Sequence, residues 1–490
     1  MDTIIENVDR QKVGFCRFKK LNDKYLLTND VGDYCFLTPV YFKALFLGKL
    51  EQIEKDNQHK YQELVDKGFV RSLLDFDRLI EKYSTKNMAL KEGPVLHIIV
   101  VTLRCNHACV YCQSNAGGVD NKTLDMDISV ARKVVDRIFE SPGSNITIEF
   151  QGGEPMLNFK TVKFIVEYAR EKNKEKKKSL KITMVSNLTC ATEKIIAFLI
   201  KNDVDICTSI DGPEYVHNKN RIIFDKNKNS YKRTVKWLKK IEDKLGAKKF
   251  KHRPNALLTL TKRSFTYSKE IVDGYVKIGL DGIHLRPMNT FSLSKKVPRT
   301  LSYTWADFIA FYRKTVDYII ELNLKKRFFY ERTAVVFLIK ILTDNDPNYL
   351  DIRSPCGAGI GQLAYDYNGN VYTCDEGRML SRIGDESFKL GNVMHNTYSE
   401  MINHPTVKAM CVASCLDNLP GCSQCVYKPY CGVCPLLNYA EQGSIFIQQP
   451  KNEKCLMQNA ILDYLFEKLE NKSCKDVFKK WVDHFMSGNQ

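Results

Sequence analysis

The sequence predicts an α/β protein with a parallel sheet covered by helices, a small α+β unit before the sheet and a cysteine-rich region after it. Between residues 93 and 325, strand-like apolar segments alternate six times with helical patterns. Six such units place parallel strands side by side and leave the helices outside. The 17 cysteines are concentrated, with three between residues 105 and 112 and nine between 356 and 455. A chain of 490 residues has room for several domains.

Residues 1–90 are predicted to form the small α+β unit. Short alternating segments with polar turns are typical of paired strands, and helical patterns follow them. A purely structural N-terminal cap would give the same pattern. The strands are expected within 14–37 with turns at 22–23 and 29–32, and the helices at 39–47, at 58–67 and after residue 70.

The six β–α units occupy residues 91–325. Their strands are mostly apolar and rich in β-branched residues, as in a sheet that is buried on both faces. The expected strands are 95–103, 146–151, 180–186, 204–210, 255–261 and 282–287. The expected helices are 127–140, 158–173, 191–202, 230–245, 267–279 and 304–324.

Three further parts follow the six units. Residues 326–355 are expected to bridge to the cysteine-rich region at 356–460. Residues 461–490 belong to a segment with two amphipathic helical patterns, which we expect to pack against that cysteine-rich region.

Composition and charge narrow the possible environments and partners. No apolar run is as long as a membrane span, and the first twelve residues lack the layout of a signal peptide. We therefore expect a cytoplasmic protein that does not enter a membrane, in which many cysteines indicate metal or redox chemistry rather than disulfides. The net charge of +17 lies largely in lysine runs without a nucleic-acid-binding motif, so nucleic acid is not favoured. An acidic peptide would be attracted by the same charge.

A loop with three cysteines follows the first predicted strand. Cys105, Cys109 and Cys112 are spaced C-x3-C-x2-C. Thiolates are the ligands that iron–sulfur clusters select, so these three can hold three irons of a 4Fe–4S cluster and leave the fourth iron open. A zinc site with a distant fourth ligand, or buried thiols without a metal, are the alternatives.

This loop and a second motif resemble the radical S-adenosylmethionine (radical SAM) superfamily. Tyr111 precedes the last loop cysteine, and Phe150-Gln151-Gly152-Gly153-Glu154-Pro155 resembles the second motif of that superfamily. The resemblance implies that the parallel sheet forms a partial (β/α)6 barrel and that Cys105, Cys109 and Cys112 are the catalytic cluster ligands. It further implies that the open iron binds SAM, whose reductive cleavage gives a 5′-deoxyadenosyl radical.

The same resemblance implies further SAM contacts at the carboxyl ends of the strands, where active groups of parallel barrels lie. The segment after the second strand would hold the amino group, Ser186 and Asn187 the ribose, Arg286 the carboxylate and the Leu285 backbone the adenine. A tight turn, a helix cap or a salt bridge could explain the same residues without SAM. The full expected set is Tyr111, Gly152, Gly153, Glu154, Ser186, Asn187, Ser209, Leu285 and Arg286.

Residues 209–221 resemble a segment of maturases with a SPASM domain. The chain reads Ser209-Ile210-Asp211-Gly212-Pro213, with His217 and Arg221 a few residues later. Asp211 could be structural or face a substrate, and His217 with Arg221 could equally be a pair on a helix surface.

The second cysteine field resembles the SPASM domain itself, which implies two auxiliary 4Fe–4S clusters. Cys415 or Cys411 could supply a missing ligand of the first cluster, or that position could be open. The spacing between Cys431 and Cys434 is one residue shorter than usual, and a zinc ribbon on the paired C-x2-C knuckles is the alternative. The implied ligands are Cys356, Cys374 and Cys434 for the first cluster, and Cys422, Cys425, Cys431 and Cys455 for the second.

The order of parts resembles a radical SAM/SPASM-domain peptide maturase, most like the His-Xaa-Ser-system radical SAM maturases. This implies a precursor peptide as substrate, an electron donor such as flavodoxin or ferredoxin, and a sister maturase protein. The N-terminal unit would be a winged-helix-like element that binds a leader peptide at a sheet edge. The alternatives are an anaerobic sulfatase-maturase-like dehydrogenase and a non-catalytic iron–sulfur or zinc module.

Overall fold

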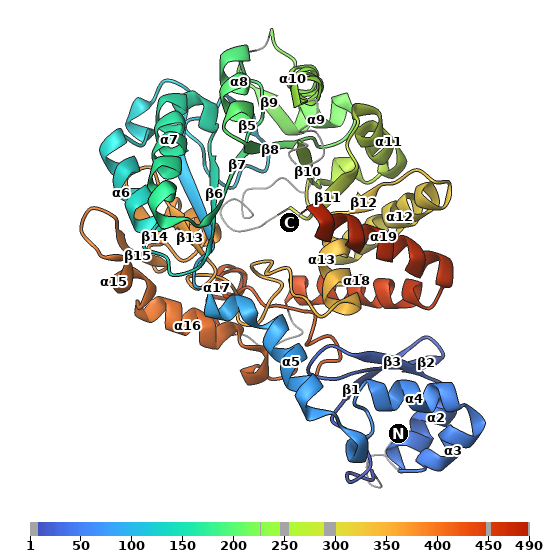
Figure 1. The fold of residues 1–490 in the computed structure, drawn as a ribbon. Helices are drawn as coiled ribbons and strands as arrows, with labels where there is room; N and C mark the ends of the chain where they lie inside the picture. The colour runs from blue at the N-terminus through green and yellow to red at the C-terminus, as the bar shows by residue number, and fades with distance from the viewer. Residues whose placement is uncertain (1–7, 226, 246–253, 289–299, 447–451, 489–490) are drawn as a thin grey trace.

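One mixed sheet of ten strands dominates the computed structural model, which describes residues 8–225, 227–245, 254–288, 300–446 and 452–488 (Figure 1). The strand order is β12-β11-β10-β8-β7-β6-β4-β13-β14-β15. Neighbouring strands from β12 to β13 are parallel, and β13, β14 and β15 pair antiparallel.

The six predicted β–α units are present, and the parallel α/β prediction is confirmed. The helices lie along the outside of the strands (Figure 1). The strands are β4 (Leu96–Thr102), β6 (Asn145–Gly152), β7 (Ser179–Val185), β8 (Val204–Ser209), β10 (Asn255–Thr259) and β11 (Gly282–Arg286). The helices are α6 (Ile128–Ile138), α7 (Phe159–Lys176), α8 (Glu193–Lys201), α10 (Ser230–Leu245), α11 (Ser268–Ile278) and α12 (Trp305–Leu324).

Local capping fixes the ends of these helices. Asp127 accepts a hydrogen bond from the Val130 amide at the start of α6, and Thr304 and Asp307 form a reciprocal capping box at the start of α12. α11 ends at Gly279, whose φ of +97° is the left-handed conformation that glycine adopts without strain.

Two further groups of elements lie beside the six β–α units. β5 (His107–Cys109), within the cysteine loop, pairs antiparallel with β9 (Arg221–Ile223), which follows α9 (Glu214–Asn220). The expected bridge 326–355 holds β12 (Tyr330–Glu331), parallel to β11, and the buried helix α13 (Arg332–Leu342).

The cysteine-rich region continues the barrel sheet. β13 lies parallel to β4, with Leu363 opposite His97, so the two parts share backbone hydrogen bonds. Its elements are β13 (Gln362–Tyr365), β14 (Asn370–Tyr372), α14 (Asp375–Ser381), β15 (Lys389–Asn392), α15 (Tyr398–Ile402), α16 (Pro405–Ser414) and α17 (Pro435–Gln442).

The two predicted C-terminal helices are α18 (Glu453–Leu469) and α19 (Lys472–Gly488). They pack mainly against α12 and α13, where the Tyr464 hydroxyl donates to Asp317 at 2.8 Å. As expected, α18 also contacts the cysteine-rich region, through Cys455 at its start and through the ring of Phe466, which packs against Tyr427 and Tyr430. No helix in the described ranges is long and apolar enough to span a bilayer.

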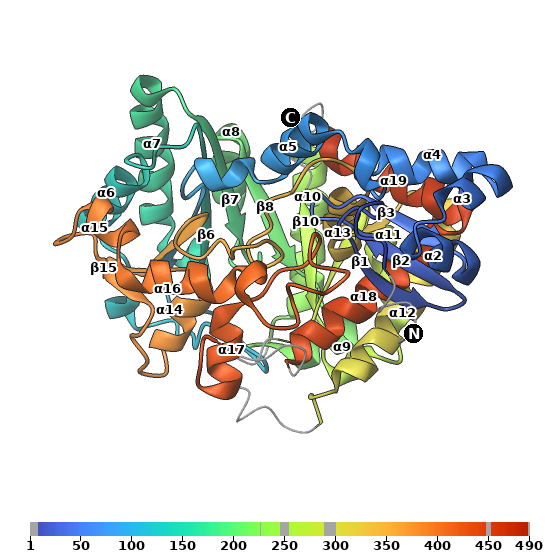
Figure 2. The ribbon, with the colours of Figure 1, turned by 90° about the horizontal axis from the view of Figure 1, so that it is seen from below.

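The N-terminal part has strands followed by helices around a small core of its own. Its sheet packs against α18 and the cysteine-rich region, where the Tyr34 ring contacts Phe466 and the Thr28 hydroxyl donates to the Val426 carbonyl at 2.6 Å (Figure 2). The elements are β1 (Arg17–Leu21), β2 (Lys24–Thr28), β3 (Tyr34–Leu37), α2 (Pro39–Phe46), α3 (Leu50–Asp56), α4 (Gln58–Asp66) and α5 (Phe76–Lys86).

Candidate active site

A cavity of about 190 Å³, here called the loop cavity, lies at the carboxyl ends of the barrel strands. The three loop cysteines line it, and so do most of the expected SAM contacts. Those that line it are Tyr111, Gly152, Gly153, Ser186, Asn187, Ser209 and Arg286.

The backbone holds the cysteine loop in place. The Cys105 amide donates to the Gly117 carbonyl at 3.1 Å, and Cys109 lies in the β5–β9 pair. Arg104 forms a two-point ion pair with Asp125, at 2.8 and 2.7 Å, beneath the loop. The loop therefore presents its three thiols to one cavity from a fixed backbone.

The donor set fits the cluster that the loop motif implies. Three thiols and His107, but no carboxylate side chain, line the loop cavity within the described residues. Nowhere in that part of the chain do three His, Cys, Asp or Glu side chains come close enough to hold a single metal ion. Three thiolates would hold three irons and leave the fourth to SAM.

A buried charged network stands behind the loop. Arg221 Nε donates to Asp211 Oδ1 at 3.1 Å, the Tyr111 hydroxyl donates to Asp211, and the Arg221 guanidinium carbon lies 5.4 Å from the centre of the Tyr111 ring. Burial raises the pKa of Tyr111 well above its usual value, so its hydroxyl stays a donor. Arg221 and His217 are both buried, which removes the interpretation of a surface pair.

Glu154 lies beneath the loop cavity rather than on its wall. Its fully buried carboxylate accepts hydrogen bonds from the Ser186 hydroxyl and the Asn187 amide, both at 2.8 Å. A Cβ on Gly153 would lie 2.1 Å from the Arg104 carbonyl oxygen. These two residues thus fix the turns that carry the cavity wall.

Leu285 and Arg286 form the end of β11, and of these two only Arg286 lines the loop cavity. The Leu285 side chain is buried, and its amide donates to Glu331 Oε1 at 3.2 Å. Arg286 is exposed, forms no ion pair within the described residues and lines two cavities.

The second of these, here called the central cavity, has a volume of about 260 Å³ and shares Arg286 and Pro287 with the loop cavity. Cys356, Cys374 and Cys434 line it. Burial raises the pKa of Cys374 well above its usual value, and the charges of Glu376 and of the other two thiols raise it further. These three cysteines are therefore neighbours, as the sequence predicts.

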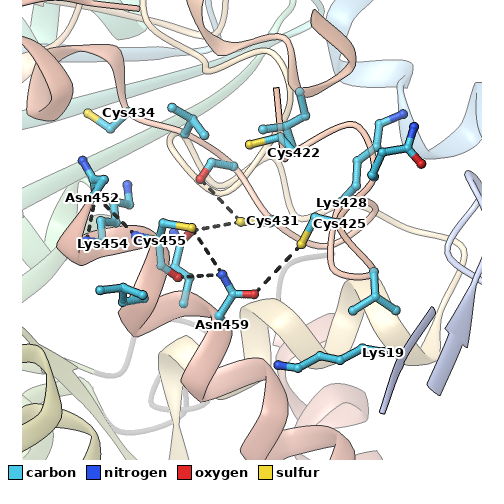
Figure 3. Close-up of a pocket in the computed structure, with 18 of the residues that line it drawn as sticks. Lys19, Cys422, Cys425, Lys428, Cys431, Cys434, Asn452, Lys454, Cys455 and Asn459 are labelled. Carbon is cyan, nitrogen blue, oxygen red and sulfur yellow. Dashed lines mark hydrogen bonds between the residues drawn. The ribbon is translucent and has the colours of Figure 1, made fainter. Parts of the chain in front are cut away.

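A third cavity of about 410 Å³, here called the outer cavity, is lined by the four cysteines predicted to hold the second auxiliary cluster. Cys422, Cys425, Cys431 and Cys455 surround it, with Asn459 donating to Cys455 Sγ at 3.3 Å (Figure 3). Burial raises the pKa of Cys422 to about 12 and that of Cys455 to about 11, so a bound metal must offset the cost of forming thiolates.

The two cysteine groups are adjacent. Cys434 also borders the outer cavity. Burial raises the pKa of Cys431, and so do the charges of Cys425, Cys455 and Cys422, which places Cys431 with the outer group of cysteines. Within the described residues, neither Cys415 nor Cys411 lines the central or the outer cavity.

Sequence reasoning missed several residues that line the loop cavity. Gln113 adjoins the cysteine loop and Gln151 lies within the second motif, so their positions could have indicated them. Met379 comes from α14 of the cysteine-rich region, and no local signal points to it. The others are His107, Ser114, Ala116, Val185, Thr259 and Pro287, whereas Arg221, which also lines the cavity, belongs to the 209–221 segment named from the sequence.

Residues 99–245 match the family model of the Radical SAM superfamily. This stretch, which contains the cysteine loop and the Gly152-Gly153 turn, is therefore a radical SAM domain.

Three curated relatives extend this comparison. The radical SAM cyclopropyl synthase TigE of Paramaledivibacter caminithermalis is 24% identical over 228 residues, 43% of this chain and 47% of TigE. The antilisterial bacteriocin subtilosin biosynthesis protein AlbA of Bacillus subtilis is 20% identical over 396 residues, 79% of this chain and 78% of AlbA. A cysteine-type anaerobic sulfatase-maturating enzyme of Clostridium perfringens is 31% identical over 123 residues, 24% of this chain and 32% of the enzyme.

The chain thus spans less than half the length of TigE and of the sulfatase-maturating enzyme. It also spans 38% of an uncharacterized protein of Methanocaldococcus jannaschii, which is 33% identical over 117 residues, 24% of this chain.

Solved structures share the fold over most of the chain. The structure of anSMEcpe with bound AdoMet has a TM-score of 0.65 at 20% identity and covers 80% of this chain and 99% of its own. The structure of Streptococcus suis SuiB bound to the precursor peptide SuiA has a TM-score of 0.54 at 14% identity and covers 90% of this chain and 99% of its own.

Proposed function

We propose that this protein is a radical SAM enzyme that cleaves S-adenosylmethionine reductively and oxidatively modifies a ribosomally made peptide. The radical SAM domain at residues 99–245 supports the first part. The similarity to AlbA, a bacteriocin biosynthesis protein, and to SuiB, whose structure holds the precursor peptide SuiA, supports the second.

One observation carries the proposal: the three cavities form a row. The loop and central cavities meet at Arg286 and Pro287, and the central and outer cavities share Cys434, Lys454 and Gln458. Each cavity brings together one of the cysteine groups that the sequence predicts. A substrate in the central cavity would therefore lie between the SAM site and the cysteine-rich region.

The chain's own residues have distinct tasks in this scheme. Cys105, Cys109 and Cys112 would hold three irons, and the backbone at Gly152 and Gly153 and the Arg286 guanidinium would orient SAM. The cluster and SAM, when bound, supply an electron and a 5′-deoxyadenosyl radical that can take hydrogen from a side-chain carbon. Met379 closes the cavity from the side of the cysteine-rich region, which helps to exclude water.

The cysteine-rich region is proposed to be a SPASM domain with two auxiliary 4Fe–4S clusters that accept the electron left on the substrate. Cys356, Cys374 and Cys434 would hold the first, and Cys422, Cys425, Cys431 and Cys455 the second. The grouping of these thiols around the central and outer cavities supports this assignment.

Finer features remain part of the proposal. They are the domain limits expected from the sequence, a winged-helix-like N-terminal unit that binds a leader peptide, a cytoplasmic location, and flavodoxin or ferredoxin as electron donor. A sister maturase and the His-Xaa-Ser subtype complete the set. The packing of β1–β3 against the cysteine-rich region supports a role for the N-terminal unit in presenting a peptide.

A protein dehydrogenase of the sulfatase-maturase kind is the second candidate, supported by the match to the Clostridium perfringens enzyme. Mass analysis of the product separates the two for a cysteine substrate, because conversion to formylglycine replaces sulfur by oxygen, whereas a cross-link or thioether removes only two hydrogens. For a serine substrate both products lose two hydrogens, and fragmentation of the peptide or labelling of the aldehyde separates them.

The decisive experiment is turnover of SAM by anaerobically reconstituted protein with dithionite. We expect 5′-deoxyadenosine, and none from a Cys105→Ala/Cys109→Ala/Cys112→Ala variant. Cys474→Ala replaces a cysteine of α19 that lines none of the three cavities, and this variant should retain full turnover. Iron-loaded protein that forms no 5′-deoxyadenosine would indicate a non-catalytic iron–sulfur module instead.

A further inference from the structure

Among the residues that the structure describes, one arginine of the central cavity, Arg332, has no counterion. Arg332, the first residue of α13, lines this cavity, and its Nε is buried without a hydrogen-bond partner. Within the described residues no ion pair or hydrogen bond reaches its guanidinium. The guanidinium carbon lies 6.0 Å from the centre of the Phe485 ring, which offers no carboxylate or carbonyl oxygen to its N–H donors.

The neighbouring acids are engaged elsewhere. Glu331 accepts hydrogen bonds from the Tyr312 hydroxyl at 2.6 Å, the Ala334 amide at 2.7 Å and the Leu285 amide at 3.2 Å. Asp351 pairs with Lys454, and Glu149 accepts from Gln151 and Thr183. Their oxygens are therefore bonded to other groups, and Glu149 acts on Arg332 only through its charge and without a hydrogen bond.

Other acids line the central cavity from the cysteine-rich region and the C-terminal helices. Glu376 lies on α14, Glu441 on α17 and Glu453 on α18. No ion pair joins any of them to Arg332 in the part of the chain that the structure describes. Arg332 lies on α13, which follows the six β–α units, whereas these carboxylates lie on α14, α17 and α18.

A partly buried guanidinium without a partner is costly, and a carboxylate can satisfy it with two parallel hydrogen bonds. Most of the remaining wall is apolar, including Phe308, Val336, Phe337 and Ile461. The ligand that suits this cavity therefore combines an apolar side chain with a nearby carboxylate.

We infer that Arg332 binds a carboxylate of the peptide substrate and thereby places a neighbouring apolar residue in the central cavity beside Arg286. This inference rests on the proposed function, because it assigns the substrate to the cavity that adjoins the SAM site. The carboxylate can be an Asp or Glu side chain or the carboxyl terminus of the peptide, since both present the same two oxygens.

The test uses full-length, anaerobically reconstituted protein with SAM and three N-acetylated tripeptides as probes. Acetyl-Leu-Asp-Leu-amide carries a side-chain carboxylate, acetyl-Leu-Asn-Leu with a free carboxyl terminus carries a terminal one, and acetyl-Leu-Asn-Leu-amide carries neither. Calorimetric titration should show one carboxylate peptide binding about tenfold more tightly than the neutral peptide, the gain expected of a charge-assisted contact. The peptide that gains identifies the source of the carboxylate.

Arg332→Gln should abolish this preference, and Arg332→Lys should retain part of it because the charge remains without the two-point geometry. Arg327→Gln, an exposed arginine five residues earlier, is the matched control and should keep the full preference. Equal affinities for all three peptides in the unsubstituted protein, no saturable binding of either carboxylate peptide in the millimolar range, or an unchanged preference in Arg332→Gln would overturn the inference.

A second readout separates this inference from the proposed function. Peptide-independent formation of 5′-deoxyadenosine should be the same for Arg332→Gln as for the unsubstituted protein. If Arg332→Gln instead loses SAM binding and keeps the peptide preference, the arginine serves SAM and the inference fails. If the unsubstituted protein forms no 5′-deoxyadenosine, the proposed function fails, while the peptide titrations still report on Arg332.

Discussion

At the scale of single residues, the motif positions divide into those that face the loop cavity and those that hold its walls. Gly152 and Ser209 line the cavity, whereas Glu154 is hydrogen-bonded beneath it to Ser186 and Asn187. The motif pattern predicted that these residues belong together, but not which of them face a ligand. That distinction depends on side-chain direction, which spacing along the chain does not determine.

The Asp211 carboxylate provides a test of the wall residues. Asp211→Asn should lower the free energy of unfolding by about 3–5 kcal/mol, because it leaves the buried Arg221 without its counterion. Denaturant unfolding measures this change. Asp225→Asn is the control, since its pair with Lys228 is on the surface and its loss should leave the unfolding midpoint nearly unchanged. Equal midpoints for Asp211→Asn and the unsubstituted protein would contradict a structural role.

At the scale of elements, the sequence predicts the six barrel strands and their helices to within a few residues. Long apolar or amphipathic segments with clear turn signals make this possible. The missed elements lack such signals: α3 buries only Leu50 and Ile53, and β5 and β9 are short strands that exist because they pair with each other. α13 is apolar on nearly all sides, so it shows no amphipathic period.

β4 joins the barrel to the cysteine-rich region, and it carries a buried histidine. His97 Nδ1 lies 3.2 Å from the Tyr365 hydroxyl of β13, and burial lowers the pKa of His97 to about 3. Because the pKa is lower in the folded state than in the unfolded chain, the neutral ring stabilises the fold above pH 6.5. This contribution is lost as the pH falls from 6.5 towards 3.

We therefore expect His97→Gln to weaken the dependence of stability on pH. Between about pH 7.5 and about pH 4.5, the unsubstituted protein should lose about 2–3 kcal/mol more unfolding free energy than His97→Gln. Denaturant unfolding at both pH values measures the difference. The exposed His395 gives the control His395→Gln, which should follow the unsubstituted protein. Parallel pH profiles for His97→Gln and the unsubstituted protein would show that His97 does not carry this effect.

At the scale of the whole molecule, the fold brings together cysteines that are far apart in sequence. Cys356, Cys374 and Cys434 meet because β13 and β14 extend the barrel sheet and α17 starts next to them. Cys455 reaches the outer cavity only because α18 begins there before it packs along α12. Spacing alone could not exclude a zinc ribbon on Cys422, Cys425, Cys431 and Cys434, since it does not show that Cys434 lies beside Cys356 and Cys374.

Metal content distinguishes these two arrangements. With about four irons in each cluster, anaerobically prepared protein should hold about twelve, and Cys356→Ala/Cys374→Ala/Cys434→Ala should hold about eight. Cys422→Ala/Cys425→Ala/Cys431→Ala/Cys455→Ala should also hold about eight, because each set empties one cavity. Cys415→Ala is the matched control within the same region and should leave iron content unchanged, since Cys415 borders neither cavity. Zinc in place of iron, released by replacing Cys434 together with Cys422, would instead establish the ribbon and remove the auxiliary clusters from the proposed function.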